Sequence, residues 1–244
     1  MAPSRDLGYT TGMALLFEQL FDPESSTYTY LIADDEAKVA ALIDPVVEQV
    51  ERDLARVAAR GLRLLSTIET HVHADHVTGG AALTERTGSR PVVHRHSPVT
   101  CEAVRLAEGD RFYVGALALE VLETPGHTPE SLSFVLGDRV FTGDALLIGT
   151  CGRTDFQGGD PGALFDSIHT RLFTLPDDTR VFPAHDYKGR TSSTIGEEKR
   201  HNARIAGKSR DEFIALMNGL GLPPPKKLEV ALEANLACGR PPQA

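Results

Sequence analysis

The chain has 244 residues, of which 41% are hydrophobic and 24% are charged, and this composition is typical of a globular protein with a substantial core. The formal net charge of −9 argues against a nucleic-acid partner, which would need a basic surface. No apolar run approaches the ~20 residues that span a bilayer, and the first residues lack the apolar core of a signal peptide. We therefore expect a soluble cytoplasmic protein with no membrane partner.

The three cysteines are Cys101, Cys151 and Cys238; they lie far apart and form no CxxC pair. An odd number at such spacing does not predict a disulfide framework, and it suits a reducing compartment. We interpret Cys101 and Cys238 as structural residues.

The hydrophobic pattern predicts strands and helices in two batches, followed by a helical tail. The first batch comprises strands at 13–21, 26–34 and 37–44, a helix at 45–61, a strand at 62–70, a short helix at 78–88 and a strand at 90–94. The second batch comprises strands at 117–123, 131–137 and 138–144, a helix at 162–175 and a strand within 179–186. Helices are expected at 196–205 and 209–221, a proline-rich break at 222–227 and a loose end at 239–244. Two batches of strands, each with helices, predict a layered α/β or α+β sandwich.

Four potential metal ligands lie within six residues directly after the strand 62–70: His71, His73, Asp75 and His76. Loops at strand ends commonly present catalytic groups on a rigid scaffold. Imidazole suits zinc, iron and copper, and a carboxylate adds a harder ligand. A solvated loop with idle histidines is the alternative interpretation.

Three further potential ligands occupy comparable places. His127 follows the strand 117–123 in a "PGHT" turn, Asp144 ends the strand 138–144, and His185 ends another apolar run. One edge of a sandwich could therefore gather all seven residues. The sequence predicts a metal site there.

The segments "HVHADH", "PGHT", "FTGD" and "PAHD" resemble the metallo-β-lactamase superfamily, whose pattern is H-x-H-x-D-H followed by His, Asp and His. The resemblance covers residues 70–185 and implies an αβ/βα four-layer sandwich. We expect residues 1–195 to form this catalytic domain and residues 196–244 to form a short C-terminal helical extension packed on it. The superfamily hosts several chemistries, so the fold alone does not give the reaction.

A finer resemblance points to the persulfide dioxygenases, the family of the ethylmalonic encephalopathy protein. It lies in "FTGDALLIGTCGRTDFQGGD" and in the tail that begins "STIGEEKRHNARI". It implies a mononuclear Fe(II) enzyme, with one ion per chain, that oxidises glutathione persulfide with O2 to sulfite and glutathione in sulfide catabolism. It also makes a homodimer possible, with a separate sulfurtransferase acting in the same pathway.

The resemblance assigns the iron to His71, His127 and Asp144, a facial triad of two histidines and one carboxylate. The remaining potential ligands then lie near the metal and hydrogen-bond to its ligands and bound water: His73, Asp75, His76 and His185.

The spacing of these residues also permits a different enzyme. A dinuclear thioesterase of the glyoxalase II type would use all seven residues, with Asp144 bridging two metals, and would hydrolyse S-lactoylglutathione. Glyoxalase II ends in a dedicated helical domain, whereas a short segment interrupted by three prolines follows His185 here. A non-catalytic module that retains the fold is the third hypothesis.

Four residues are candidates for binding glutathione persulfide. Arg153 could pair with a glutathione carboxylate, and Tyr187 or Thr128 could donate a hydrogen bond to the persulfide or to bound oxygen. We expect Cys151 to line the site without acting as a nucleophile, because buried inert cysteines are the commoner case.

Overall fold

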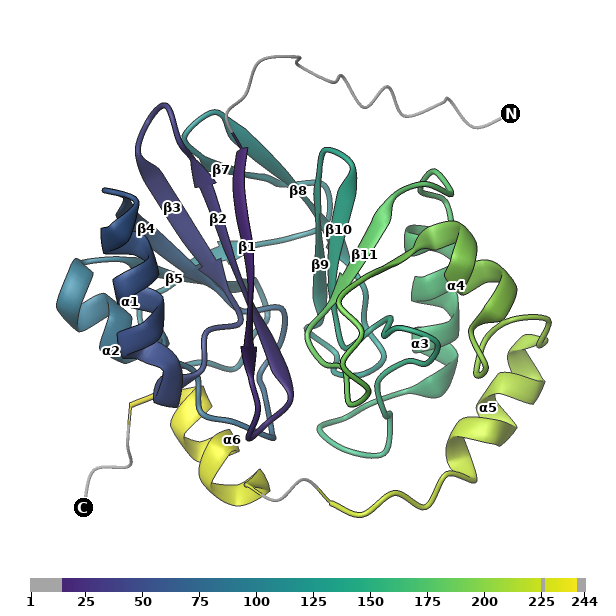
Figure 1. Cartoon of the computed structure of the whole chain (residues 1–244). Coiled ribbons are helices and arrows are strands. Elements are labelled where there is room, and N and C mark those ends of the chain that lie inside the picture. Colours follow the sequence, from purple (N-terminus) through teal and green to yellow (C-terminus); the bar gives the residue numbers. More distant parts are fainter. Residues whose placement is uncertain (1–14, 225–226, 241–244) are drawn as a thin grey trace.

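The computed structural model describes residues 15–224 and 227–240, and within them the strands form two six-stranded sheets that face each other (Figure 1). The first sheet has the order β1-β2-β3-β4-β5-β6. Its strands are β1 (Leu15–Asp22), β2 (Thr27–Asp34), β3 (Val39–Ile43), β4 (Arg63–Ile68), β5 (Arg90–His94) and β6 (Val104–Leu106). Pairing is antiparallel from β1 to β3 and parallel from β3 to β6.

The second sheet has the order β12-β11-β10-β9-β8-β7. Its strands are β7 (Arg111–Val114), β8 (Leu117–Glu123), β9 (Leu132–Leu136), β10 (Arg139–Gly143), β11 (Arg180–Pro183) and β12 (Ser193–Thr194). Only β10 and β11 pair in parallel among these strands.

Helices cover the outer face of each sheet. On the first sheet these are α1 (Val50–Ala59), which follows a 3-10 turn at Val47–Gln49, and α2 (Gly80–Thr87). On the second sheet these are α3 (Pro161–Ser167), which continues as a π-helical turn at Ile168–Leu172, then α4 (Ile195–His201) and α5 (Arg210–Asn218). A last helix, α6 (Leu228–Leu236), lies at the lower end of the first half in Figure 1. Among the described residues, no helix combines the length and apolar character that crossing a bilayer needs.

Three apolar layers hold the sheets and helices together. Inward-facing residues of both sheets, among them Tyr30, Phe134 and Phe141, form the central layer. One outer layer packs α1 and α2 on the first sheet, and the other packs α3, α4 and α5 on the second. β2 and β3 are buried along their whole length, because the sheet is covered on both faces. The predicted αβ/βα four-layer sandwich is confirmed.

The sequence did not predict every element. β6, β7, β12 and α6 were missed because each is short or follows a proline-rich stretch without a strong periodic signal. The helix expected at 196–205 ends at His201, where Asn202 takes an extended conformation. The helix expected at 209–221 begins with a capping box between Ser209 and Glu212, a local signal present in the sequence.

The expectation that the cysteines form no disulfide is wrong for one pair. Cys101, in the loop between β5 and β6, is bonded to Cys238 just after α6, with a Cα–Cα distance of 6.1 Å. The two residues are 137 positions apart, and only the packing of α6 under the first sheet brings them together. Cys151 is free and buried.

The C-terminal segment reaches both halves of the molecule. α4 and α5 pack on the second sheet through Ile195, Phe213 and Met217, whereas α6 is bonded to the first half through Cys238. The separation of residues 1–195 from 196–244 as a domain and its extension stays a prediction.

Candidate metal centre

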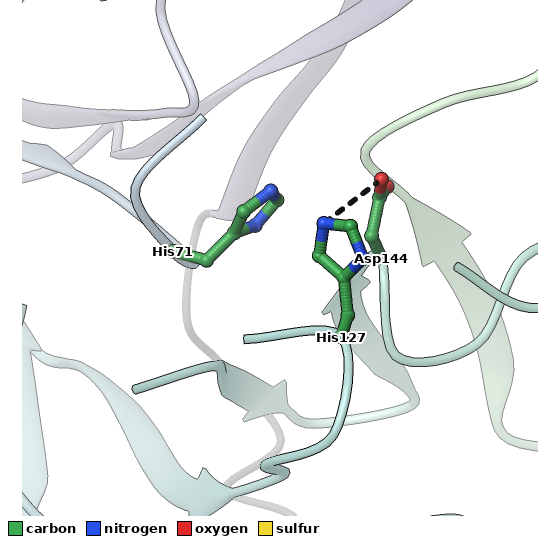
Figure 2. Close-up of side chains that lie close together, drawn as sticks. All are labelled: His71, His127 and Asp144. Carbon is green, nitrogen blue, oxygen red and sulfur yellow. Dashed lines mark ion pairs between the residues drawn. The ribbon is translucent and has the colours of Figure 1, made fainter. Parts of the chain in front are cut away.

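The predicted ligands come from four strand ends that meet at one edge of the two sheets. His71 follows β4, His127 lies in the turn between β8 and β9, and Asp144 and His185 follow β10 and β11. Figure 2 shows the side chains of His71, His127 and Asp144 pointing toward one another from three separate segments.

Glycines make this convergence possible. Gly126 has a φ of +137°, and a Cβ there would overlap the backbone of Leu164 in α3. Gly143 has a φ of +52°, and a Cβ there would lie 2.7 Å from Thr70 Oγ1. Only glycine therefore fits before His127 and before Asp144, because the backbone passes too close to a neighbour.

The three side chains form a compact group of metal-binding atoms. One nitrogen from each histidine and one oxygen of Asp144 lie within 4.8 Å of one another. Within this group, His127 Nε2 lies 3.7 Å from Asp144 Oδ2. His71 is buried, and the side chains of His127 and Asp144 are 11% and 12% exposed, so the group opens to solvent on one side.

Hydrogen bonds fix which ring nitrogen of each histidine is free. His127 Nδ1 lies 2.7 Å from the carbonyl oxygen of Arg153, which only accepts, so Nδ1 carries the proton. Thr70 Oγ1 donates to Asp44 Oδ2 at 2.9 Å and must therefore accept from His71 Nδ1 at 3.0 Å. In both rings Nδ1 donates to a protein oxygen and Nε2 is left for another partner, the arrangement usual for metal-bound histidines. The donor set fits a metal ion.

The charges of the site favour an ionised Asp144 beside a neutral His71. Burial alone would raise the pKa of Asp144, but His185, His127 and His71 outweigh it and lower that pKa. Burial lowers the pKa of His71 well below its usual value, and the neighbouring His73 and His127 add to the effect. An anionic aspartate and a neutral imidazole are the forms that bind a metal ion.

His185 lies between two carboxylates. Its Nδ1 is 2.7 Å from Asp144 Oδ1, and its Nε2 is 2.7 Å from Asp75 Oδ2. Burial opposes protonation, but the two carboxylates outweigh it and raise the pKa of His185 well above its usual value. The same carboxylate oxygen, Asp75 Oδ2, also lies 3.2 Å from His76 Nδ1.

His73 turns toward two acids that the sequence analysis missed. His73 Nε2 lies 3.1 Å from Asp44 Oδ1 and 3.6 Å from Glu69 Oε2. Burial works against the charge of His73, but Asp44 and Glu69 outweigh it and raise the pKa of His73 to about 9. Burial raises the pKa of Glu69 to about 7. Asp44 directly follows β3 in "ALIDP", a strand-end position like those of the predicted ligands.

The geometry offers further potential ligand groups besides the first triad. His73, Asp75 and His76 lie close enough to hold an ion, and so do Asp44, Glu69 and His73. His73 Nδ1 and His76 Nε2 are buried and have no hydrogen-bond partner among the described residues. The arrangement of side chains therefore accommodates one ion or two.

A cleft of about 600 Å³ opens in front of the triad. His127, Asp144 and His185 line its floor, and the candidates Cys151, Arg153 and Tyr187 line its walls. The volume is that of a typical small-molecule site. Arg204, which the sequence analysis did not single out, is a second guanidinium group on the wall, and its Nη1 donates to the carbonyl oxygen of Cys151 at 2.8 Å.

The remaining candidates have local partners. Arg153 forms an ion pair with Asp155, at 2.6 Å from Nε to Oδ1, and donates to the carbonyl oxygens of Leu222 and Pro223. Tyr187 is 71% exposed and stacks on His185 with a centroid distance of 6.0 Å. Thr128 is fully buried and bonds to Ser131 Oγ, outside the lining of the cleft.

Comparisons with known proteins agree with this geometry. A model of the "metallo-beta-lactamase superfamily" matches residues 22–185. The mitochondrial persulfide dioxygenase ETHE1 of Mus musculus is 45% identical over 232 residues, which cover 94% of this chain and 91% of that protein. A crystal structure of ETHE1 from Myxococcus xanthus is 56% identical, covers 92% of this chain and 100% of its own, and superposes with a TM-score of 0.91.

A hydroxyacylglutathione hydrolase from Cereibacter sphaeroides is also similar, with 38% identity over 170 residues, but these cover only 67% of this chain and 64% of that protein. The ETHE1 similarity, in contrast, covers more than nine-tenths of this chain and of the mouse protein. The chain belongs to the metallo-β-lactamase superfamily and, within it, to the family of the ETHE1 persulfide dioxygenases.

Proposed function

We propose that the protein is a glutathione-dependent persulfide dioxygenase that uses one Fe(II) ion per chain. The observation that carries the proposal is the triad of His71, His127 and Asp144, with each histidine Nδ1 donating to a protein oxygen, in a chain of this family. The reaction would convert one glutathione persulfide, one O2 and one water into one glutathione and one sulfite. The terminal sulfur loses four electrons in this reaction, and O2 accepts them.

Iron is the metal that this ligand set favours. Two histidines and one carboxylate on one face of an octahedron form the ligand set of non-heme Fe(II) oxygenases and leave three positions open. An Fe(II) ion there would supply the one-electron chemistry through which O2 reacts with closed-shell sulfur. The hydrogen bonds from Nδ1 to Thr70 and Arg153 orient the two rings for it.

The polar residues around the triad have positioning roles in this proposal. Asp75 and Asp144 hold His185 between them, so the imidazole supplies a fixed proton donor beside the ligand carboxylate. His73 is paired with Asp44, whose other oxygen accepts from Thr70 and so supports the orientation of His71. These contacts match the hydrogen-bonded partners that usually surround metal ligands.

Substrate binding is assigned to the cleft. Glutathione carries two carboxylates, and Arg153 and Arg204 are the guanidinium groups on the wall. Arg153 already pairs with Asp155, so a substrate carboxylate there would share or replace that partner. Tyr187 projects from beside His185 and can donate to the persulfide. Cys151 is a wall residue with no nucleophilic role, and Thr128 has a structural bond to Ser131 in place of a substrate contact.

The alternative is a dinuclear hydrolase of the glyoxalase II type. The unpartnered nitrogens of His73 and His76 favour it, because a second ion could take both. The shorter coverage of the hydroxyacylglutathione hydrolase and the full-length match to ETHE1 favour the dioxygenase. A cytoplasmic location, a homodimer and a separate sulfurtransferase stay predictions; the name of the mouse relative places that protein in mitochondria.

The decisive experiment combines metal analysis with two activity assays. Protein purified without chelator is analysed for iron and zinc, then tested for O2 uptake with glutathione persulfide and for hydrolysis of S-lactoylglutathione. We expect one iron per chain, prompt O2 uptake and release of sulfite. Two zinc ions per chain with thioester hydrolysis and no O2 uptake would replace the proposal with the alternative.

A further inference from the structure

The buried side chain of Asn235, which is 4% exposed, joins the helix α6 to the loop that carries the histidine cluster. Its Oδ1 accepts from the backbone N–H of Thr78 at 2.8 Å. Its Nδ2 donates to the carbonyl oxygens of His73 and His76, both at 2.8 Å. A single amide thus holds three backbone groups of a loop to which it is not close in sequence.

The loop between β4 and α2 belongs to neither a strand nor a helix, so its buried carbonyls need donors from elsewhere in the protein. Leu132 N–H donates to the carbonyl of Thr70, and Gln157 Nε2 donates to that of Val72. Asn235 supplies the donors for His73 and His76. Without the amide of Asn235, the carbonyls of His73 and His76 would lose their only protein donors among the described residues. A buried acceptor without a donor is unfavourable, so we expect the loop to rearrange.

The end of α6 is itself firmly attached, so the amide of Asn235 has a fixed place. The disulfide joins Cys238 to Cys101, and the carbonyl of Cys238 accepts from Ala81 N–H at 2.8 Å. The carbonyl of Leu236 accepts from Thr100 N–H at 2.7 Å. A Cβ at Gly239 would overlap the carbonyl oxygen of Thr78, so the backbone after the helix lies directly on the loop.

We propose that Asn235 is a positioning residue of the metal centre: it sets the conformation of residues 71–78 and thereby the place of the His71 ring. It touches neither metal nor substrate and acts through the backbone of His73 and His76. The inference rests on the proposed function only in taking His71 as a metal ligand. It assigns a role in the metal site to the C-terminal extension, which lies far from that site in sequence.

The test is the affinity of the apoprotein for Co²⁺, measured from the visible absorption of the bound ion. Asn235→Ala should weaken binding by roughly tenfold, within the range known for groups that orient metal ligands. Asn235→Asp keeps the acceptor for Thr78 N–H but replaces both donated hydrogen bonds by repulsion between oxygens, so it should weaken binding at least as much. With iron bound, kcat should fall while the KM for glutathione persulfide stays unchanged. Asn235→Asp is isosteric and carries the test if Asn235→Ala does not fold.

Two variants of the same helix serve as controls. Leu232→Ala removes apolar packing of α6 but keeps the amide, and Glu233→Ala changes an exposed position. Both should retain the Co²⁺ affinity of the unmodified protein. If Leu232→Ala weakens Co²⁺ binding as much as Asn235→Ala at an equal loss of melting temperature, general loosening of α6 explains the effect and the inference is wrong. The Co²⁺ titration reads the metal site without any turnover, so a protein that consumes no O2 can still confirm or overturn the role of Asn235.

Discussion

The Nδ1 atom of His127 lies 2.7 Å from the carbonyl oxygen of Arg153, and this bond joins one candidate metal ligand to the loop after β10, which begins with another, Asp144. The loop folds back so that the N–H of Gly152 donates to the carbonyl oxygen of Asp144 at 2.8 Å. Two candidate ligands that follow different strands are therefore connected to one another through residues 152 and 153.

Gly152→Ala tests whether these two hydrogen bonds hold His127 and Asp144 in place. A Cβ at Gly152 would overlap the carbonyl oxygen of Asp144 and would lie 3.0 Å from His127 Nδ1, so both ligands must shift. We expect the iron affinity to fall by at least about tenfold, and the free energy of unfolding of the apoprotein to fall by about 1–3 kcal/mol from overpacking. Iron titration and urea unfolding measure the two effects. In Gly219→Ala, the control, the added Cβ has an ordinary contact of 3.4 Å, and unchanged iron binding is expected. Equal iron binding in both variants would show that the loop does not hold the ligands.

His73→Asn distinguishes one metal ion from two. In the mononuclear proposal His73 is the cation that pairs with Asp44 and Glu69, so its loss leaves two buried acids without their partner. We expect about 3 kcal/mol lower stability, with one iron per chain retained. His71→Ala should instead lose the iron. Metal analysis of the purified variants distinguishes the two cases. Loss of metal from His73→Asn would mean that His73 is itself a ligand.

Cys151→Ala should retain most of the kcat, because the thiol is buried and unreactive. Burial raises the pKa of Cys151 to about 11, and the Sγ atom lies 3.9 Å from Met217 Sδ. At pH 8 roughly one thiol in a thousand is then ionised, so alkylation by iodoacetamide should be slow in the native protein. Complete loss of turnover in a folded variant with full iron content would assign Cys151 a chemical role.

Asp53 gives the stability a pH dependence that is separate from the metal site. Its side chain is fully buried in α1, and burial raises its pKa from 3.8 to about 6, although the adjacent Arg52 opposes the shift. The folded state therefore holds the proton more tightly than the unfolded state. The contribution of Asp53 to the free energy of unfolding is therefore largest below pH 4 and falls by about 2–3 kcal/mol as the pH rises toward 6. Above that range the loss is constant.

Asp53→Asn should remove this dependence. The free energy of unfolding of both proteins is measured with urea from pH 4 to 8. The value for the variant minus that for the unmodified protein should rise between pH 4 and 6 and stay constant above pH 6. The difference between the two proteins cancels the other titrating groups. A constant difference across the whole range would contradict the raised pKa of Asp53.

The disulfide between Cys101 and Cys238 should stabilise the fold, since it closes a long loop and anchors α6. Cys101→Ser should lower the free energy of unfolding by roughly 2–5 kcal/mol. Dithiothreitol should lower the stability of the unmodified protein to that of the variant and leave the variant unchanged. An unmodified protein that does not respond to dithiothreitol would argue that the two thiols are not joined in solution.

The sequence determined the architecture of this protein and which side chains gather as candidate metal ligands. Short apolar strands followed by histidine or aspartate predicted both the sandwich and the edge at which His71, His127 and Asp144 gather, because strand ends of one sheet share an edge. These signals are local: each needs only a few neighbouring residues.

The tertiary structure decided which atoms are free and what holds them. The bonds from Asp44 through Thr70 to His71, from Arg153 to His127 and from Asn235 to the cluster join residues far apart in the sequence. The pairing of Cys101 with Cys238 is of the same kind. No local pattern encodes these contacts, since hydrogen bonds act over about 3 Å and depend on how α6 and the two sheets finally pack.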